Sequence, residues 1–285
     1  MDKTTNKKII VVGAGYIGAP LCRALAARGQ PVVGIRRSDS RTGMQGVEMK
    51  CADVTDPASL RAIWPDRVED LVFCAARGAD QGYDELYVQG MQNLLEVVEQ
   101  VGSAMRRVLF VSSTGVYGES RGQWVDEDTE PVPTREAGRI MLQAEEILRS
   151  FPGESVAVRC AGLYGPGRAR LIRAVQQGKD RPGRRPSTWL NQIHRDDCIG
   201  VVQHLLDVPN PHPLYIATDE EPALRVDVLS WLAQAMKCTM PLAAATDHTE
   251  GKRCSNRRLL DAGYQFRFPT YREGYAQVLA AGQGA

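Results

Sequence analysis

A glycine-rich turn between a β-branched run and a helical pattern constrains this chain more than any other feature of its sequence. The segment VVGAGYIGAPL carries Gly13, Gly15 and Gly18 in a GxGxxG pattern. The first glycine permits a tight turn, the second lets a pyrophosphate approach the backbone, and the third lets helix and strand pack closely. A helix that begins here offers free N–H groups and a positive dipole end to phosphates. The pattern predicts a dinucleotide site that includes Tyr16 and Ile17.

Short β-branched runs alternate with longer helical patterns through the first half of the chain. Strand, helix and strand at this spacing predict right-handed crossovers and a parallel sheet covered on both faces. We therefore expect a doubly wound α/β Rossmann fold, with a dinucleotide-binding domain at residues 1–165 and a smaller substrate-binding region at 166–285. A late strand at about 213–217 should rejoin the sheet. The other expected strands are 7–12, 31–35, 47–53, 70–76, 107–113 and 154–165, and the expected helices are 17–30, 87–101, 135–151, 195–207 and 225–237.

The end of the second expected strand indicates which dinucleotide binds. A fold of this kind that prefers NAD usually places an acid there, which accepts a hydrogen bond from the ribose 2′-hydroxyl. Here the strand is followed by Arg36, Arg37 and Ser38, and two guanidinium groups could bind a 2′-phosphate bidentately. We therefore expect NADP(H), with NAD(H) less favoured, although two solvated surface arginines would give the same pattern.

Composition and charge exclude several classes of protein. The 285 residues are 43% hydrophobic and 24% charged, which is ordinary for a globular chain. A formal net charge of +1 gives no field that favours nucleic acid or an anionic membrane. Seven scattered cysteines without a CxxC pair, and four histidines without ligand spacing, predict reduced thiols and no metal site. No apolar run suits a signal peptide or a membrane span. We expect a soluble, cytoplasmic protein with a small-molecule substrate, and a homodimer is one option.

Further motifs follow one family's order along nearly the whole chain. They are GAGYIG, CADVTD, CAARG, SSTGVYGE, VRCAGLYGPGR, NQIHRDDCIGVV and the tail SNRRLLDAGYQFRFPTYREGY. With these motifs the chain resembles the extended short-chain dehydrogenase/reductase family of NAD(P)-dependent epimerases, dehydratases and reductases. The resemblance implies that Asp53 and Val54 lie on the adenine side of the cofactor. It also implies that Ala75, Ala76 and Arg77 line the cofactor.

The same resemblance implies a catalytic serine, tyrosine and lysine. In the family the tyrosine exchanges a proton with the substrate oxygen, and the lysine lowers the pKa of the tyrosine and holds the nicotinamide ribose. The serine falls on Ser113, which would orient the substrate. The tyrosine and lysine positions hold Ala137 and Met141, and a register shifted by one gives Gly138 and Leu142. Because no Tyr-x-x-x-Lys occurs anywhere in the chain, the usual acid–base pair is absent.

Other side chains are candidates to deliver a proton. Tyr117 and Tyr164 follow strand ends, where α/β sheets border their ligand crevice, and we include them among the catalytic candidates. Tyr87 and His194 are further donors, and each of the four could instead be structural. An unperturbed tyrosine, with a pKa of about 10, is a poor acid near neutrality. Arg139 is a cation on the helix in question, but an arginine cannot act as a tunable acid.

Three functions remain open at this point. Arg181, Arg184 and Arg185 could close over an anionic group, or they could form a solvated basic loop. The expected function is an NADP(H)-dependent reductase or dehydrogenase that acts on a small metabolite, an anionic one being an option, without the tyrosine–lysine pair. One alternative is a non-catalytic NADP(H)-binding sensor or partner-binding protein. A second alternative is a sugar-nucleotide epimerase or dehydratase, and fold-level analogy does not separate the three.

Overall fold

The chain folds into two compact units, each assembled from three segments of sequence. The computed structural model describes residues 8–38, 43–78, 81–102, 104–118, 121–178, 187–238 and 249–282. The sequence-based division after residue 165 is a single cut, and it stays a prediction. The first unit is Met1–Val116, Thr134–Arg159 and Val202–Leu214, and the second is Tyr117–Pro133, Cys160–Val201 and Tyr215–Ala285.

A seven-stranded sheet confirms the predicted α/β fold class. Its strand order is β11-β7-β5-β4-β1-β2-β3, and the pairs β1–β2, β2–β3, β1–β4 and β4–β5 are parallel. The chain leaves β1 in one direction and returns to β4 on its other side, so the topological switch point lies at the carboxyl end of β1. The strands are β1 (Lys8–Val12), β2 (Val32–Arg36), β3 (Val47–Cys51), β4 (Val68–Phe73), β5 (Arg107–Ser113), β7 (Glu154–Cys160) and β11 (Leu214–Ala217).

The central strands are buried because they are continuous apolar runs. Ile10, Leu71 and Val108, on three neighbouring strands, are fully enclosed. Side chains on both faces of a parallel sheet face helices rather than water, so strict polar–apolar alternation is absent. The burial of these runs is the main contribution to the stability of the first unit.

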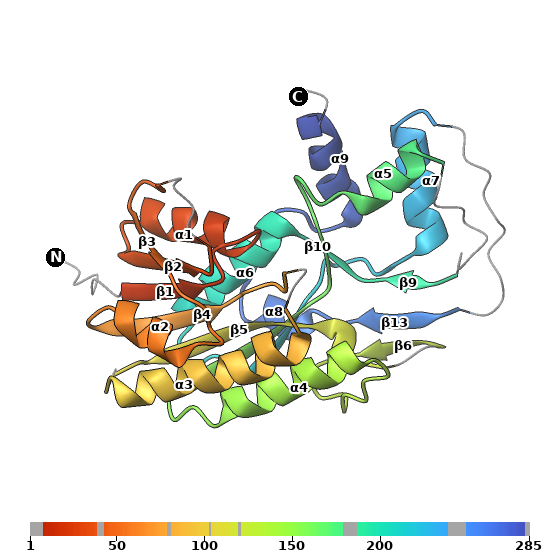
Figure 1. Cartoon of the computed structure of the whole chain (residues 1–285). Coiled ribbons are helices and arrows are strands. Elements are labelled where there is room, and N and C mark those ends of the chain that lie inside the picture. The colour runs from red at the N-terminus through yellow and green to blue at the C-terminus, as the bar shows by residue number, and fades with distance from the viewer. Residues whose placement is uncertain are drawn as a thin grey trace. The chain divides into compact units, whose positions relative to one another are not determined.

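Helices cover both faces of the sheet in the first unit. Figure 1 shows α1 on one side of the strands and α2, α3 and α4 on the other. The start of α2 follows from local sequence, since Asp56 accepts a hydrogen bond from the amide of Ala58 and Pro57 occupies the first turn. None of the described helices is both long and apolar enough to cross a bilayer. The helical elements are α1 (Gly18–Ala27), α2 (Pro57–Ile63), the π-helical turn η1 (Glu85–Gln89), α3 (Gly90–Gln100), the 3-10 turn η2 (Thr114–Val116) and α4 (Glu136–Arg149).

The second unit contains short strand pairs and a helical core. The pairs β6–β13 and β8–β10 are parallel, and β9–β12 is antiparallel. The strands are β6 (Arg121–Val125), β8 (Gly162–Tyr164), β9 (Trp189–Leu190), β10 (Gln192–His194), β12 (Ala223–Leu224) and β13 (Gly251–Cys254). The helices are α5 (Arg170–Gln176), α7 (Arg225–Ala235), α8 (Arg257–Asp261) and α9 (Tyr271–Gly282), while α6 (Arg195–Asp207) contributes residues to both units.

A buried ion pair holds α4 against the sheet. Glu145 of α4 and Arg159 of β7 are each 1% exposed, and Arg159 Nη2 lies 2.7 Å from Glu145 Oε2. Ser112 of β5 donates its hydroxyl to Glu145 Oε1 at 2.5 Å. Any rotation of α4 would leave these charges buried and unpaired, which is costly. The network therefore fixes the register in which α4 presents Ala137 and Met141.

Replacing Arg159 with methionine should destabilise the protein by about 3–5 kcal/mol, because Glu145 would keep a buried charge without its cation. Urea unfolding followed by circular dichroism measures this change. The control, Arg149→Met, removes the exposed i,i+3 partner of Glu146 and should alter the free energy of unfolding little. Equal effects of the two substitutions would contradict the role given to Arg159.

Candidate dinucleotide site

Gly13 closes the turn after β1 against the loop that follows β4. Its φ is +94°, in the left-handed region that favours glycine. A Cβ at this position would lie 2.2 Å from the Cα of Ala75, so no side chain fits. A Cβ on Gly18 would lie 2.3 Å from the carbonyl oxygen of Gly13, so α1 can approach the loop only through a glycine. These are the turn and packing roles that the sequence predicts for the two positions.

Gly15 faces open space on the same loop. A Cβ there would meet no neighbour closer than the carbonyl oxygen of Gly13, at 3.9 Å. Tyr16 and Ile17 continue the loop to Gly18, and the first turn of α1 has neither a side-chain cap nor an acid. Ala19 and Leu21 donate their amides to the carbonyl oxygens of Gly15 and Ile17, and Pro20 has no N–H. The amides of Ile17 and Gly18 have no backbone acceptor among the described residues and are available to an anion. The fold does not require glycine at position 15, whereas a closely approaching pyrophosphate would.

Two arginines stand where β2 ends. Arg36 is the last residue of the strand, and Arg37 and Ser38 follow it as exposed residues. Arg37 Nη1 donates to Gln81 Oε1 at 3.4 Å, and within the described ranges neither arginine pairs with an acid. A Cβ on Gly78 would lie 3.0 Å from Arg37 Nη2, so a glycine leaves room for the guanidinium. Both cations remain available to a phosphate.

The loop after β4 is held by contacts of its own. Arg77 Nη1 donates to the carbonyl oxygen of Gln81 at 3.2 Å, and Ala76 is exposed beside it. The hydroxyl of Tyr87, on η1, donates to the carbonyl oxygen of Ala75 at 3.4 Å. Burial raises the pKa of Tyr87 to about 12. Tyr87 thus positions this loop, and its hydroxyl is a poor proton donor near neutral pH.

Asp53 and Val54 lie just after β3. Asp53 Oδ1 accepts hydrogen bonds from the amide of Thr55 at 2.9 Å and from its hydroxyl at 2.8 Å. The carbonyl oxygen of Val54 accepts from Asn93 Nδ2 at 2.9 Å. Asp53 therefore shapes the turn with one oxygen. Its other oxygen accepts no hydrogen bond from the residues that the structure describes, and is free to meet a ligand.

Ser113 is the last residue of β5, and its side chain is partly exposed. Its Oγ accepts a hydrogen bond from the amide of Gly115 at 3.0 Å. Because the amide uses Ser113 as an acceptor, the hydroxyl proton remains available to an oxygen of a substrate. The substrate-orienting role that the family resemblance implies for Ser113 stays a prediction.

The helix α4 carries no replacement acid at the two family positions. Ala137 is partly exposed, and Met141 is buried at 6% exposure. In the shifted register, Gly138 is buried and Leu142 is partly buried. None of these side chains can exchange a proton or supply a charge, and Arg139 is the exposed cation beside them.

Two tyrosines proposed as proton donors are packed inside the second unit. The hydroxyl of Tyr117 donates to the carbonyl oxygen of Asp126 at 2.7 Å, and Lys252 Nζ donates to the carbonyl oxygen of Tyr117 at 2.6 Å. The ring of Tyr164 stacks on that of Tyr275, with centroids 4.2 Å apart. Burial raises the pKa of Tyr164 above its usual range. These contacts favour packing roles, and catalysis by either tyrosine stays a prediction.

His194 is held as a neutral ring at the end of β10. It is 1% exposed, and burial lowers its pKa. The amide of Asp196 donates to His194 Nδ1 at 3.2 Å, which places the ring proton on Nε2. A neutral, enclosed imidazole of this kind is better suited to packing than to proton exchange with a substrate.

Two contacts at these positions were not foreseen from the sequence. Gln81 meets Arg37 across 44 residues, and Lys252 meets Tyr117 across 135 residues. No local pattern marks either contact, because both depend on how distant segments are brought together. The predicted arginine loop, with Arg181, Arg184 and Arg185, lies outside the described residues.

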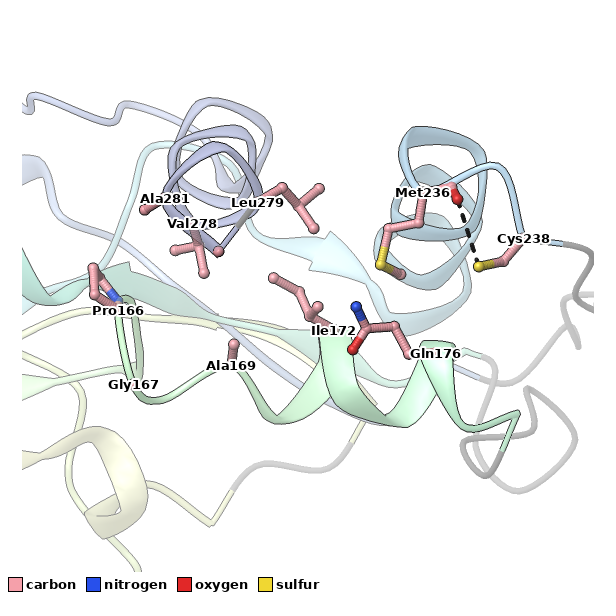
Figure 2. Close-up of a pocket in the computed structure, with 11 residues that line it drawn as sticks. Pro166, Gly167, Ala169, Ile172, Gln176, Met236, Cys238, Val278, Leu279 and Ala281 are labelled. Atoms are coloured by element: carbon pink, nitrogen blue, oxygen red, sulfur yellow. Dashed lines mark hydrogen bonds between the residues drawn. The ribbon is translucent and has the colours of Figure 1, made fainter. Parts of the chain in front are cut away.

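A separate pocket of about 500 Å³ opens between α5, α7 and α9 of the second unit. Figure 2 shows Ile172, Met236, Val278 and Leu279 lining it, with the amide of Gln176 at one side. None of the described residues that line the pocket carries a charge, and none is a predicted site residue. The described lining therefore supplies no cation to an anionic substrate.

Comparison with known proteins agrees with this geometry. A model described as the NAD dependent epimerase/dehydratase family matches residues 9–207. Protein YeeZ of Escherichia coli strain K12 is 31% identical in an alignment of length 282, which covers 92% of this chain and 97% of YeeZ. A dTDP-L-rhamnose 4-epimerase of Burkholderia thailandensis is 30% identical in an alignment of length 166, which covers 52% of this chain and 45% of that protein. A solved NAD-dependent epimerase/dehydratase structure from Methylobacillus flagellatus has a TM-score of 0.87 at 40% identity, and the match covers 98% of this chain and 100% of that one. The chain belongs to the NAD dependent epimerase/dehydratase family, as its resemblance to the extended short-chain dehydrogenases/reductases implied.

Proposed function

We propose that the chain is an NADP(H)-dependent oxidoreductase that acts on a small metabolite without a tyrosine–lysine pair. The observation that carries this proposal is the pair Arg36 and Arg37, which have no acid partner among the described residues and stand at the end of β2. The family is described by its dependence on NAD, and NAD-preferring folds usually place an acid at this strand end. Arginines at this strand end, in place of an acid, support binding of a cofactor that carries a 2′-phosphate.

Each described residue of the cofactor site has a distinct task in this proposal. The backbone at Gly15 and the start of α1 would hold the pyrophosphate, and Arg36 and Arg37 would hold the 2′-phosphate. When bound, the nicotinamide ring would supply or accept a hydride. Ser113 would donate its hydroxyl proton to a substrate oxygen and hold the substrate in place, so that proximity and orientation lower the barrier. Substrates that need no strong acid, such as imines or activated alkenes, suit such a site best.

A non-catalytic sensor of NADP(H) is the second candidate. The observation that favours it is α4, where Ala137 and Met141 leave the family's proton-handling positions without a titratable group. A sensor would bind the cofactor without transferring hydride, and a partner's affinity would change with cofactor.

A sugar-nucleotide epimerase or dehydratase is the third candidate. Similarity to the dTDP-L-rhamnose 4-epimerase supports it. The absence of a Tyr-x-x-x-Lys motif counts against it, because removal of a proton from a sugar hydroxyl needs a positioned base.

NADPH selectivity tests the two arginines. Arg36→Ala and Arg37→Ala should each weaken NADPH binding roughly 10- to 100-fold, because a charge-assisted contact to a phosphate contributes about 1.5–3 kcal/mol. Affinity for NADH should stay unchanged in both variants, as measured by fluorescence titration. Arg28→Ala is the matched control, since Arg28 follows the far end of α1 and pairs with Asp207. If the unmodified protein binds NADH more tightly than NADPH, the preference for NADP(H) is wrong and the cofactor is NAD(H).

Substitution of two glycines separates folding from cofactor binding. Gly15→Ala should keep the melting temperature of the free protein and weaken both dinucleotides, because the added methyl group enters space that is otherwise open. Gly13→Ala should lose the fold, because its Cβ would clash with Ala75. Thermal unfolding with and without NADPH measures both effects. Full NADPH binding by Gly15→Ala would show that the pyrophosphate lies elsewhere.

Turnover separates an enzyme from a sensor. We expect NADPH oxidation with at least one member of a panel of carbonyl, imine and enone acceptors, followed by absorbance. Ser113→Ala should then lower kcat about 100-fold, as the loss of one oriented donor does elsewhere, while NADPH affinity stays the same. Tight NADPH binding without turnover of any acceptor would favour the sensor instead.

A further inference from the structure

Asp219 is a buried carboxyl group without a partner in the second unit. It lies two residues after β11 and is 2% exposed. Neither of its carboxyl oxygens accepts a hydrogen bond within the described ranges. Its backbone is nevertheless fixed, because its amide donates to the carbonyl oxygen of Gln192 at 2.7 Å. A charged carboxylate in this position would have lost its water without gaining a donor, which is costly.

The charges around Asp219 make ionisation still less favourable. Burial is the largest cause that raises the pKa of Asp219 well above its ordinary value. The backbone N–H of Glu221 is near enough to favour the charged form in part, without completing a hydrogen bond. The charged side chains with the largest effect on Asp219 are negative: Glu221, Asp197 and Glu273. Glu221 is itself paired with the guanidinium of Arg272. The environment therefore favours a neutral carboxylic acid.

Uncharged polar groups complete the surroundings of Asp219. Tyr164 of β8 lies near enough to Asp219 for the charge of Asp219 to raise the pKa of Tyr164. The hydroxyl of Tyr164 and the Oε1 atom of Gln192 have no hydrogen-bond partner among the described residues. Gln192 Nε2 donates to the hydroxyl of Tyr275 at 2.6 Å. The titratable and charged groups on the surrounding elements are Tyr164 of β8, His194 of β10, Asp197 of α6, Glu221 after β11, Tyr271, Glu273 and Tyr275 of α9, and Arg170 and Arg225, which act on Tyr275.

We propose that Asp219 is protonated at neutral pH and forms a pH-sensitive latch between the end of β11 and β10 in the second unit. Thr218 and Asp219 both bind the carbonyl oxygen of Gln192, and Asn256 Nδ2 donates to the carbonyl oxygen of Thr218 at 3.0 Å. The buried carboxyl group of Asp219 belongs to the residue whose amide makes one of these contacts. Its ionisation at higher pH places a charge among the three acids and loosens this packing.

The sign of the pH dependence follows from the raised pKa. In the unfolded chain Asp219 loses its proton at about pH 3.9, whereas the folded protein keeps it to higher pH. The stability that Asp219 contributes is therefore complete below about pH 4 and is lost as the pH rises through the folded-state pKa. Asn at position 219 mimics the neutral acid and removes this loss.

Melting temperatures of the full-length chain from about pH 5 to about pH 9 test the latch. Between the unfolded-state and folded-state pKa values of Asp219, the melting temperature of the unmodified protein should fall by roughly 3 °C per pH unit relative to that of Asp219→Asn. The reason is that one unit of pKa difference changes stability by about 1.4 kcal/mol. Asp261→Asn, in the exposed pair with Arg257, is the matched control and should follow the unmodified protein. Parallel curves for all three proteins would overturn the proposal.

Infrared spectroscopy of the unmodified protein gives an independent measurement if Asp219→Asn does not fold. With aspartate labelled by carbon-13 at its carboxyl group, a neutral C=O stretching band should persist at neutral pH and vanish at alkaline pH. A spectrum at neutral pH with carboxylate bands alone would show that Asp219 is ionised and would refute the latch.

Discussion

The close approach of Gly13 to Ala75 is the constraint on which the candidate cofactor site depends. A side chain of any size at Gly13 would separate the loops that follow β1 and β4. The amides of Gly13 and Ala14 also donate to the carbonyl oxygen of Ile35, each at 2.9 Å, so the same turn is tied to β2. Three parallel strands thus fix one short loop at the switch point of the sheet, and that loop leaves Gly15 facing open space. Local stiffness there, rather than a large pocket, is what makes the loop suitable for a pyrophosphate.

The central strands of the sheet were predictable because they are apolar runs, and burial on both faces selects such runs. The edge strand β3 is not such a run, since it contains Glu48 and Lys50 and has no buried residue. The expected strand at 154–165 is split into β7 and β8. Apart from β8, the short strand pairs of the second unit were not predicted from the sequence. Asn191 shows why: its Nδ2 donates to the carbonyl oxygen of Lys252 at 2.9 Å, and its Oδ1 accepts from the amide of Cys254 at 2.6 Å. Strands of two to five residues that depend on such distant partners carry no periodic signal of their own.

The sequence predicted the positions of the candidate site whose residue type is set by backbone geometry. It did not predict which side chains are buried. Gly13 and Gly18 occupy positions that only glycine fits, and a sequence shows glycines directly. Tyr164 was singled out for its place after a strand end, yet it packs on Tyr275 inside a hydrophobic core. The local sequence does not mark Asp219 as buried, because its enclosure depends on distant segments. Of the acids that act on it, Glu221 is two residues away, whereas Asp197 and Glu273 come from α6 and α9.

The missing tyrosine and lysine do not loosen α4, because Glu145 and Arg159 anchor it independently of those positions. The cofactor site is therefore where function is tested most directly. The decisive measurement is a crystal structure of the full chain grown with NADP⁺. We expect the 2′-phosphate between Arg36 and Arg37 and the pyrophosphate beside Gly15. A ribose end that touches neither arginine, or a glycine loop that stays empty at saturating NADP⁺, would contradict the assignment.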